Sequence, residues 1–166
     1  MTPDELLARE AIRDLIARYN HAGDRGLLDE LVACFAQDGA MDLEGEPRLE
    51  GRPAIHAHLS GVVRLLAAST RRATLRHHVS SVRIVIHDAA HAEAWSYFSA
   101  FTEIGLDHWG RYADRLVRSG SEWLFALRKV RVDGAAPGSR MVAPSTRKGA
   151  DVSRPTRSEA KPSEGR

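Results

Sequence analysis

The sequence predicts an α+β fold, in which a curved antiparallel sheet is covered by helices from the N-terminal part of the chain. Three observations predict it. Up to about residue 67, apolar residues recur mainly with helical spacing. From Thr74 the pattern changes to long segments rich in β-branched and aromatic residues, separated by short turns. Helices that are segregated from the strands, rather than alternating with them, are typical of α+β proteins.

Length and composition indicate a single globular domain. The chain of 166 residues can form one domain with a full core and is too short for two ordinary ones. Its single cysteine, Cys34, excludes an intramolecular disulfide and fits a reducing compartment. The acidic N-terminal segment lacks the apolar run of a secretion signal, and no stretch is apolar enough to span a membrane. We therefore expect a cytoplasmic protein with no membrane association.

A basic tail is predicted after the folded part. Residues 135–166 contain seven Lys or Arg and three acidic residues, a net charge of +4, so the rest of the chain sums to −2. The segment is rich in Pro, Ser, Gly and Ala, and it cannot bury enough apolar surface to offset its ordering entropy. We expect a folded domain over residues 1–134 and a disordered tail over 135–166. Since the tail lacks interleaved aromatic residues, nucleic acid is not expected as a partner.

Two helices are predicted at the start of the chain. Thr2 is a suitable N-cap for the first, which should end near Gly23. Apolar spacing from Leu27 to Phe35 predicts the second, and the turn signal at residues 37–39 should end it.

A short strand over residues 40–43 and a third helix beginning at Pro53 are predicted next. Four long strands follow, over residues 74–87, 91–104, 108–118 and 122–132. Turns this short imply consecutive antiparallel hairpins. Long, curved strands closed by three helices would form a cone-shaped α+β barrel, and its interior is a natural apolar cavity.

Two adjacent histidines, His77 and His78, open the first long strand. Neighbouring side chains of a strand point to opposite faces, so one of the two rings should face inward. His77 shares the parity of Val79, whereas the later apolar face begins at Val82 with the opposite parity. A bulge near residues 80–81 would reconcile the two faces and place His77 inside, where an imidazole can exchange a proton near neutral pH. The reverse orientation, with His78 inside, is the alternative.

Asp24, between the first two helices, is a carboxylate that could orient such a ring. In the simpler interpretation it is the N-cap of the second helix, a common use of Asp. In the functional interpretation it orients and charges the histidine, as in general-base catalysis. Tyr19, about one helical turn earlier, is either a core residue with a satisfied hydroxyl or a part of the same site.

No metal or cofactor is expected. The spacing of His56 and His58 directs their rings to different faces of a helix. The sequence has no Gly-rich phosphate loop, nucleophile elbow or dinucleotide fingerprint. His87 and His91 flank a turn and should be solvated, whereas His108 could line the mouth of a cavity.

Aromatic residues on two neighbouring strands are expected to supply the walls of a ligand site. Those on the concave side would suit an apolar, ring-shaped ligand. The predicted substrate-binding residues are Trp95, Tyr97, Phe98, His108, Tyr112 and Arg115. The simpler interpretation of residues 110–115 is a half-buried strand in which Asp114 pairs with arginines across the sheet.

Several short motifs occur in a fixed order along the chain. They are Ala11-Ile12-Arg13-Asp14-Leu15 followed by Tyr19 and Asp24, Phe35-x-x-Asp38, Gly51-Arg52-x-Ala54-Ile55, His77-His78-Val79-Ser80-Ser81 and Gly110-x-Tyr112-x-Asp114-Arg115, with Trp123 and Arg128 in the last strand. In this order and spacing, the chain resembles the SnoaL-like family of the nuclear transport factor 2-like superfamily over roughly residues 5–134. The resemblance implies the α+β cone, assembled as a homodimer or homotrimer.

The catalytic relatives that look most similar are bile-acid 7α-dehydratases and lindane dehydrochlorinases, with scytalone dehydratases more distant. In the first two, an Asp between the helices and a His on the first long strand form a dyad that abstracts a proton. Matched by position, these residues are Asp24 and His77. The dehydratase type also has a Tyr five residues before its Asp, which matches Tyr19. Other relatives keep the cavity without the chemistry.

The residues and the resemblance together predict a cofactor-independent lyase of the dehydratase kind, or an isomerase or cyclase, that acts on a small, apolar, cyclic substrate. His77 would be the base, Asp24 its partner and Tyr19 a hydrogen-bond donor. The first alternative is a non-catalytic protein that binds a small molecule in the same cavity. The second is a dimerisation module whose basic tail binds a partner.

Overall fold

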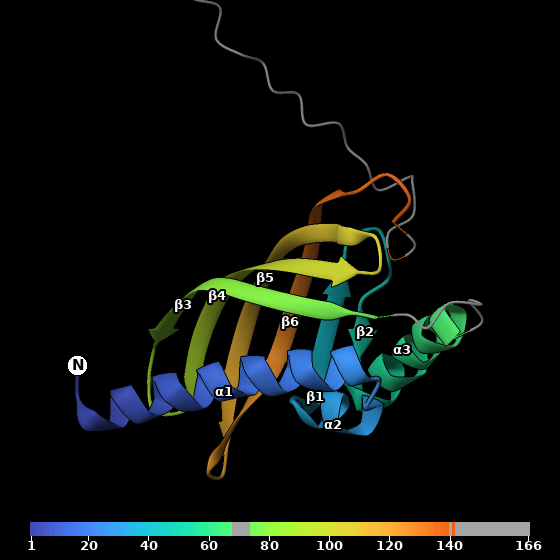
Figure 1. The fold of residues 1–166 in the computed structure, drawn as a ribbon. Helices are drawn as coiled ribbons and strands as arrows, with labels where there is room; N and C mark the ends of the chain where they lie inside the picture. Colours follow the sequence, from blue (N-terminus) through green and yellow to red (C-terminus); the bar gives the residue numbers. More distant parts are fainter. Residues whose placement is uncertain (68–73, 140, 142–166) are drawn as a thin grey trace, which may run out of the picture.

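The computed structural model describes residues 1–67, 74–139 and 141. The elements of this part follow in the order α1 (Pro3–Arg25), α2 (Leu28–Ala33), β1 (Phe35–Leu43), β2 (Leu49–Glu50), α3 (Gly51–Ala67), β3 (Arg76–Ile86), β4 (His91–Thr102), β5 (Gly105–Ser119) and β6 (Glu122–Ala135). The sheet curves around the helices, and α1 runs along its concave side (Figure 1). The predicted α+β class and cone shape are confirmed.

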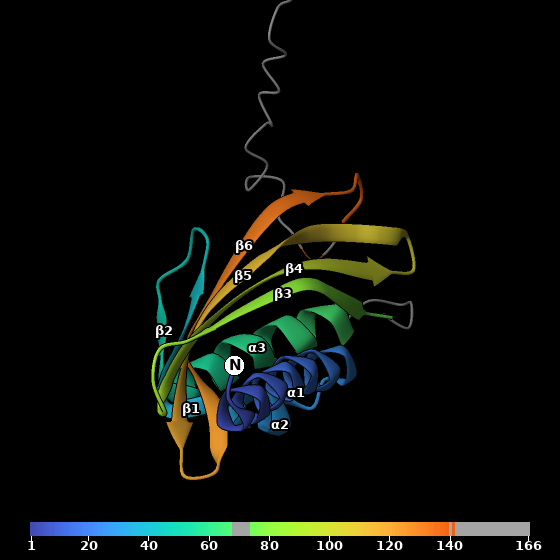
Figure 2. The ribbon, with the colours of Figure 1, turned by 90° about the vertical axis from the view of Figure 1, so that its left-hand side faces the viewer.

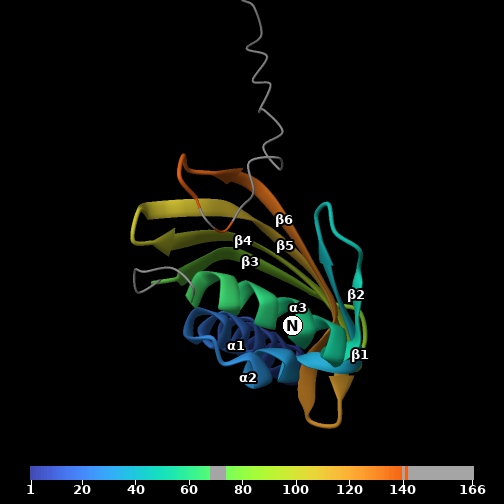
Figure 3. The ribbon, with the colours of Figure 1, turned by 90° about the vertical axis from the view of Figure 1, so that its right-hand side faces the viewer.

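The sheet is open and mixed. Its strand order is β2-β1-β6-β5-β4-β3, with β2 and β3 at the two edges (Figures 2 and 3). Strands β3 to β6 form the predicted antiparallel hairpins. The prediction of an antiparallel sheet is wrong for β1, which pairs with β6 in parallel. Parallel neighbours need a long crossover instead of a hairpin, and the whole chain between β1 and β6 supplies it.

Helix α1 extends beyond its predicted end at Gly23 to Arg25. It begins as predicted, with the Thr2 hydroxyl accepting the N–H of Glu5 at 3.1 Å. Its C-cap is Gly26, whose φ of 68° is a left-handed conformation that glycine adopts without strain. The helix therefore ends at the glycine that its C-terminal geometry requires, and the earlier glycine is an ordinary helical residue.

This extension decides between the two interpretations of Asp24, which lies in the last turn of α1. The N-cap of α2 is Leu27, and it makes no side-chain capping hydrogen bond. The interpretation of Asp24 as the cap of the second helix is therefore wrong.

Strand β1 begins at Phe35, a residue that apolar spacing assigns to the end of the second helix. The predicted turn at residues 37–39 lies inside β1, where the register with β6 shifts between Phe35 and Ala40. Gly39 approaches β6 so closely that a Cβ at this position would lie 2.6 Å from the carbonyl oxygen of Phe125. The turn signal therefore marks an irregularity within a strand, where only glycine fits.

The long strands show the predicted bulge and one displaced turn. In β3 the predicted bulge is present, because the register with β4 shifts between Ser80 and Arg83, and Ser81 has a φ of 52°. The turn predicted at residues 105–107 lies earlier, at residues 103–104, so that β5 begins at Gly105. This shift places Asp107 inside a strand.

The C-terminal end of the sheet also extends beyond its prediction. β6 continues to Ala135, and the N–H of Ala136 donates to the carbonyl oxygen of Asp107 at 2.7 Å. The predicted tail thus begins with residues that pack on β5, while 140 and 142–166 lie outside the described residues and their disorder stays a prediction. Within the described part of the chain, no helix combines the length and the apolar character needed to cross a membrane.

A fully buried ion pair lies in the core between β5 and β6. Arg128 donates from Nε and Nη2 to the two carboxylate oxygens of Asp114, at 2.9 and 2.8 Å, and neither side chain is exposed. The guanidinium carbon also lies 4.1–4.2 Å from the ring centres of Tyr19, Tyr112 and Phe125. A buried charge is tolerated only when it is paired, so Asp114 holds the Arg128 guanidinium in place. The three aromatic rings pack against that guanidinium, which therefore helps to fix their relative positions.

We expect Gly39→Ala to destabilise the fold by about 1–3 kcal/mol, because the new methyl group would press on backbone atoms that cannot rotate away. Urea unfolding measures this. The matched control is Gly61→Ala in α3, where a Cβ has no neighbour within 4 Å. There, alanine should stabilise the helix by up to about 1 kcal/mol. Equal effects at the two positions would contradict the close approach at Gly39.

We expect Asp114→Asn to cost about 3–5 kcal/mol of unfolding free energy, because Arg128 would keep its charge without a counter-ion. Asp133→Asn is the control, since it breaks the partly exposed pair between Arg111 and Asp133 and should cost at most about 1 kcal/mol. A loss at Asp114 as small as that at Asp133 would contradict the described environment of Arg128.

Candidate active site

A cavity of about 420 Å³ lies between the helices and the concave side of the sheet. Most of its wall is apolar, with Leu31, Met41, Val62 and Val130 among the contributors. The polar side chains that reach it are Tyr19, Asn20, Glu44, Glu46, His58, His77, His108 and Tyr112. A largely apolar cavity with a few converging polar groups is typical of a small-molecule site.

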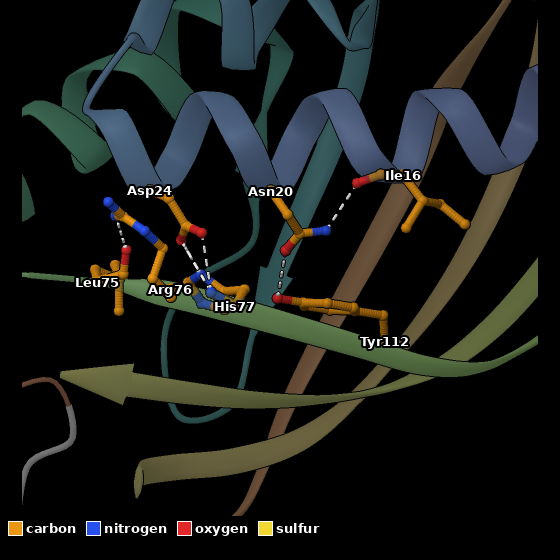
Figure 4. Close-up of polar contacts among 7 residues, drawn as sticks. All are labelled: Ile16, Asn20, Asp24, Leu75, Arg76, His77 and Tyr112. Carbon is orange, nitrogen blue, oxygen red and sulfur yellow. Dashed lines mark hydrogen bonds and ion pairs between the residues drawn. The ribbon is translucent and has the colours of Figure 1, made fainter. Parts of the chain in front are cut away.

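Asp24 on α1 contacts His77 on β3, and His77 lines this cavity (Figure 4). Oδ1 of Asp24 lies 2.6 Å from Nδ1 of His77. The main-chain N–H of His77 donates to the same carboxylate, at 2.9 Å to Oδ2 and 3.2 Å to Oδ1. The carboxylate is thus bound to the ring and the backbone of one residue, which fixes the helix end against the start of the strand.

This contact determines which nitrogen of His77 is available for chemistry. An ionised carboxylate only accepts hydrogen bonds, so Nδ1 of His77 carries the proton that Asp24 accepts. In the neutral ring, Nε2 is then an unprotonated acceptor. His77 lines the cavity with 17% of its side chain exposed, and His78, its neighbour in sequence, is exposed on the other face. The geometry is that of an oriented general base.

Tyr19 belongs to both the core and the cavity wall. Its ring lies edge-on to those of Phe35, Tyr112 and Phe125, with ring centres 5.6–6.4 Å apart. Burial raises the pKa of Tyr19, so that its hydroxyl keeps its proton and can donate. The two interpretations of Tyr19 are therefore compatible: a packed ring that lines the cavity.

A second polar contact lies one helical turn before Asp24. The hydroxyl of Tyr112 donates to Oδ1 of Asn20 at 3.4 Å, and Nδ2 of Asn20 donates to the carbonyl oxygen of Ile16 at 2.7 Å (Figure 4). Burial also raises the pKa of Tyr112. Sequence reasoning missed Asn20, although its four-residue spacing from Asp24 places both on one face of α1.

Of the predicted substrate-binding residues, Phe98, His108 and Tyr112 line the cavity. Phe98 stacks on Tyr112 with ring centres 4.7 Å apart, and His108 lies with its ring centre 6.2 Å from that of His77. These residues come from β4 and β5 and form the wall opposite α1.

The prediction is wrong for Trp95, Tyr97 and Arg115, which lie on the outer face of the sheet. Trp95 is 36% exposed and Tyr97 is 59% exposed, and Arg115 is exposed as well. Side chains of a strand alternate between faces, so the inward position of Phe98 sends Tyr97 outward. The remaining inward positions of β4 hold small residues, Ala92, Ala94, Ser96 and Ala100.

Comparison with solved structures finds the same fold in several proteins. A protein of unknown function from Mycobacterium tuberculosis is 25% identical, with 80% of this chain and 77% of that chain covered and a TM-score of 0.69. A structure described as a putative scytalone dehydratase from Novosphingobium aromaticivorans is 23% identical, with coverages of 82% and 91% and a TM-score of 0.70. A hexachlorocyclohexane dehydrochlorinase of the LinA type from Novosphingobium barchaimii is 19% identical, with coverages of 85% and 98% and a TM-score of 0.68.

A comparison with curated protein sequences finds no match. Residues 4–129, by contrast, match the SnoaL-like domain family, and this range includes Tyr19, Asp24, His77 and His108. The match covers three quarters of the chain and agrees with the solved structures of the same fold. The chain therefore belongs to the SnoaL-like domain family.

Proposed function

We propose that the protein is a cofactor-independent lyase of the dehydratase kind, or an isomerase or cyclase built from the same groups, in which His77 abstracts a proton from carbon. The observation that supports this most strongly is the 2.6 Å contact of Asp24 with His77, a residue that lines a largely apolar cavity. The relatives described as dehydratase and dehydrochlorinase share the fold and make an elimination the favoured reaction class.

In the proposed reaction, Nε2 of His77 removes a proton from a carbon of the bound substrate. Asp24 accepts the hydrogen bond from Nδ1, holds the tautomer and stabilises the imidazolium that forms. A positioned base of this kind contributes about 100-fold to 10,000-fold to a reaction rate. The main-chain hydrogen bonds from His77 to Asp24 keep the carboxylate in place while the charge on the ring changes.

Tyr19 is proposed to donate a hydrogen bond to the oxygen on which negative charge develops. Its hydroxyl stays protonated because burial raises its pKa. A donor in an apolar site is worth more than the same donor in water, because no solvent competes for the charged oxygen. With a base on one wall and this donor nearby, loss of water from a hydroxylated substrate fits the site best.

The proposed substrate is a small, apolar, cyclic molecule. A cavity of about 420 Å³ falls within the size range of small-molecule sites, and its aliphatic wall offers few partners for a polar ligand. Phe98 and Tyr112 stack on each other in the wall beside His77, where they could pack on a ring. Assembly of the chain as a homodimer or homotrimer stays a prediction from the family resemblance.

A second candidate is a non-catalytic binding protein, which the apolar cavity would serve equally well. The two candidates differ in what they require of Asp24 and His77. A binding protein needs only the shape of the cavity, whereas the lyase needs the unprotonated Nε2 of His77.

We expect His77→Gln and Asp24→Asn each to lower proton abstraction by about 100-fold or more, because one removes the base and the other its orienting charge. The probe is nitrobenzisoxazole, an apolar ring that a base opens: the base takes the C–H proton, the N–O bond breaks and a phenolate is released. The measurement is the release of coloured phenolate under saturating and subsaturating probe.

The matched control for this test is His78→Gln, which alters the outward-facing neighbour of His77 and should leave turnover unchanged. Circular dichroism and thermal unfolding establish that all three variants are folded. Binding of the probe without turnover, or equal activity of the three variants, would support the binding protein and contradict the lyase.

We expect Tyr19→Phe to lower kcat for the same probe about 10-fold with little change in KM, since the hydroxyl would act on the charge that develops as the phenolate leaves. Tyr97→Phe is the control, because its hydroxyl lies on the outer face of the sheet. A rise in KM at unchanged kcat would assign Tyr19 to binding alone.

A further inference from the structure

A second carboxylate–imidazole pair is formed by the neighbours Asp107 and His108, of which His108 lines the same cavity. Successive residues of a regular strand face opposite sides, yet Asp107 is 1% exposed and His108 is 7% exposed. The register between β4 and β5 explains this, because Ala100 pairs with His108 and Phe101 pairs with Leu106. Asp107 is thus an extra residue, a bulge that turns two consecutive polar side chains inward.

The carboxylate of Asp107 is held on several sides. Its Oδ1 lies 2.8 Å from Nδ1 of His108 and accepts the hydroxyl of Ser139 at 2.6 Å, and its Oδ2 accepts the hydroxyl of Thr102 at 3.2 Å. Burial alone would raise the pKa of Asp107, but the hydrogen bonds from Ser139 and His108 outweigh it and lower the pKa. Asp107 is therefore an ionised acceptor, which makes Nδ1 of His108 the donor.

With Nδ1 of His108 engaged, its Nε2 is the nitrogen available to the cavity that this residue lines. The ring of His108 stands nearly perpendicular to that of His77, with an interplanar angle of 85° and 6.2 Å between centres. The ring of Phe98 contacts both, at 6.0 Å from His77 and 5.8 Å from His108. Two imidazoles, each with its own carboxylate on Nδ1, thus face one apolar space.

A purely structural role is the simpler interpretation of such a pair. His91 and Asp88 provide the comparison: their 3.0 Å contact joins two exposed side chains at a turn, where it does no more than close the loop. The pair of Asp107 and His108 differs because both side chains are buried, and because His108 lines the cavity and faces the proposed base. Among the described residues packed on the His108 ring, Asp107 and His77 are titratable and Phe98 is not.

We propose that His108, oriented by Asp107, is a second acid–base group of this cavity and delivers a proton to the oxygen that leaves the substrate. This assignment rests on the proposed lyase function and completes it, since the loss of water from a hydroxylated substrate needs an acid as well as a base. Asp107, Ser139 and Thr102 are positioning residues. Because Ser139 follows the end of β6, the segment after the last strand contributes to the site.

The proposed step moves two protons, one to His77 and one from His108. The reactive form has a neutral His77 and a protonated His108. Because burial lowers the pKa of His108, only a minor share of His108 carries this proton near neutral pH. Nε2 of His77 takes the proton from carbon, and the C–H electron pair forms the new double bond. The C–O bond breaks with its electron pair on oxygen, which takes the proton from Nε2 of His108 and leaves as water. A proton then passes from His77 to His108 through that water and restores the starting state.

The charge distribution around His108 supports a donor. Burial lowers the pKa of His108, Asp107 offsets part of this effect, and His77 lowers it further. A proton on His108 is therefore held less tightly than on a solvated histidine, which favours its transfer to a leaving oxygen. A cationic His77 would repel a proton on His108, so the proton on His108 is held when His77 is neutral.

The test is a series of benzisoxazoles in which the C–H bond that breaks is the same and the leaving phenolate varies in basicity. A basic phenolate needs a proton from the enzyme, and a nitro-substituted one does not. His108→Gln should lower kcat/KM about 100-fold for the most basic phenolate and less than about 3-fold for the nitro compound. Ser139→Ala should also lower kcat/KM most for the basic phenolates, but by a smaller factor. His91→Gln, which alters the exposed pair of His91 and Asp88, should leave kcat/KM unchanged across the series.

A uniform loss across the series, or no loss, would overturn the assignment of His108. His77→Gln separates this result from failure of the proposed function, because it should lower every member of the series equally. If His77→Gln changes nothing, the proposed base is wrong whatever His108 does.

An NMR titration of the full chain labelled with 15N-histidine tests the assignment without turnover. His77→Gln should raise the titration midpoint of His108, since it removes the neighbouring cation. An unchanged midpoint would mean that the two rings do not act on one cavity and would overturn the proposal.

Discussion

The site depends on one carboxylate that contacts a single residue twice. Asp24 binds both the main-chain N–H and the ring Nδ1 of His77, and so it fixes the position and the tautomer of the ring together. This is possible because α1 continues to Arg25 before Gly26 ends it, which brings the last helical turn over the start of β3. Without that final turn, Asp24 would lie in a connection and could cap the next helix instead.

The strand contributes the complementary constraint. A regular β3 could not place both His77 and the later apolar residues on its concave face. The shift between Ser80 and Arg83 lets His77 reach the cavity while Ile84 is buried in the core. β5 uses the same device at Asp107, where an extra residue turns two neighbouring polar side chains inward. Both of the irregularities that matter for the cavity thus lie beside a histidine, which agrees with the tendency of bulges to occur at functional sites.

Beneath the cavity, the buried pair of Arg128 and Asp114 holds the aromatic floor. The guanidinium lies between Tyr19, Tyr112 and Phe125, and the packing of these rings positions two hydroxyls in the wall. Because the surroundings are apolar, each polar contact here is stronger than it would be in water, and each unpaired group would be costlier. The apolar surroundings therefore strengthen the ion pair of Arg128 with Asp114, and they also strengthen the hydrogen bonds that would support proton transfer at His77.

Sequence patterns predicted the features that depend on local periodicity. The parity change in β3 predicted the bulge and the inward position of His77, and Thr2 predicted the start of α1. The features that were missed depend on tertiary contacts: the parallel pairing of β1 with β6, and the outward face of Trp95 and Tyr97. Apolar character alone does not decide which face of a strand an aromatic residue takes, because small residues such as Ala94 occupy the inner positions.

Asp107 shows how local signals can mislead. Gly105 and Asp107 are typical turn residues, and they predict a turn where the chain is already in β5. Only the register between β4 and β5, together with the contacts from Ser139 and His108, shows that this carboxylate is buried beside a residue of the cavity wall. Asn20 was missed for a different reason, since a polar residue on a helix is ordinary until its neighbour Tyr112 is known.

The central claim is that Asp24 holds His77 as the Nδ1–H tautomer with Nε2 free to accept a proton. The 15N chemical shifts of the His77 ring in the full-length protein at neutral pH measure this directly. The account predicts a protonated Nδ1 and an unprotonated Nε2, with this tautomer preference lost in Asp24→Asn. A ring protonated on Nε2, or one whose tautomer is the same in Asp24→Asn, would contradict it.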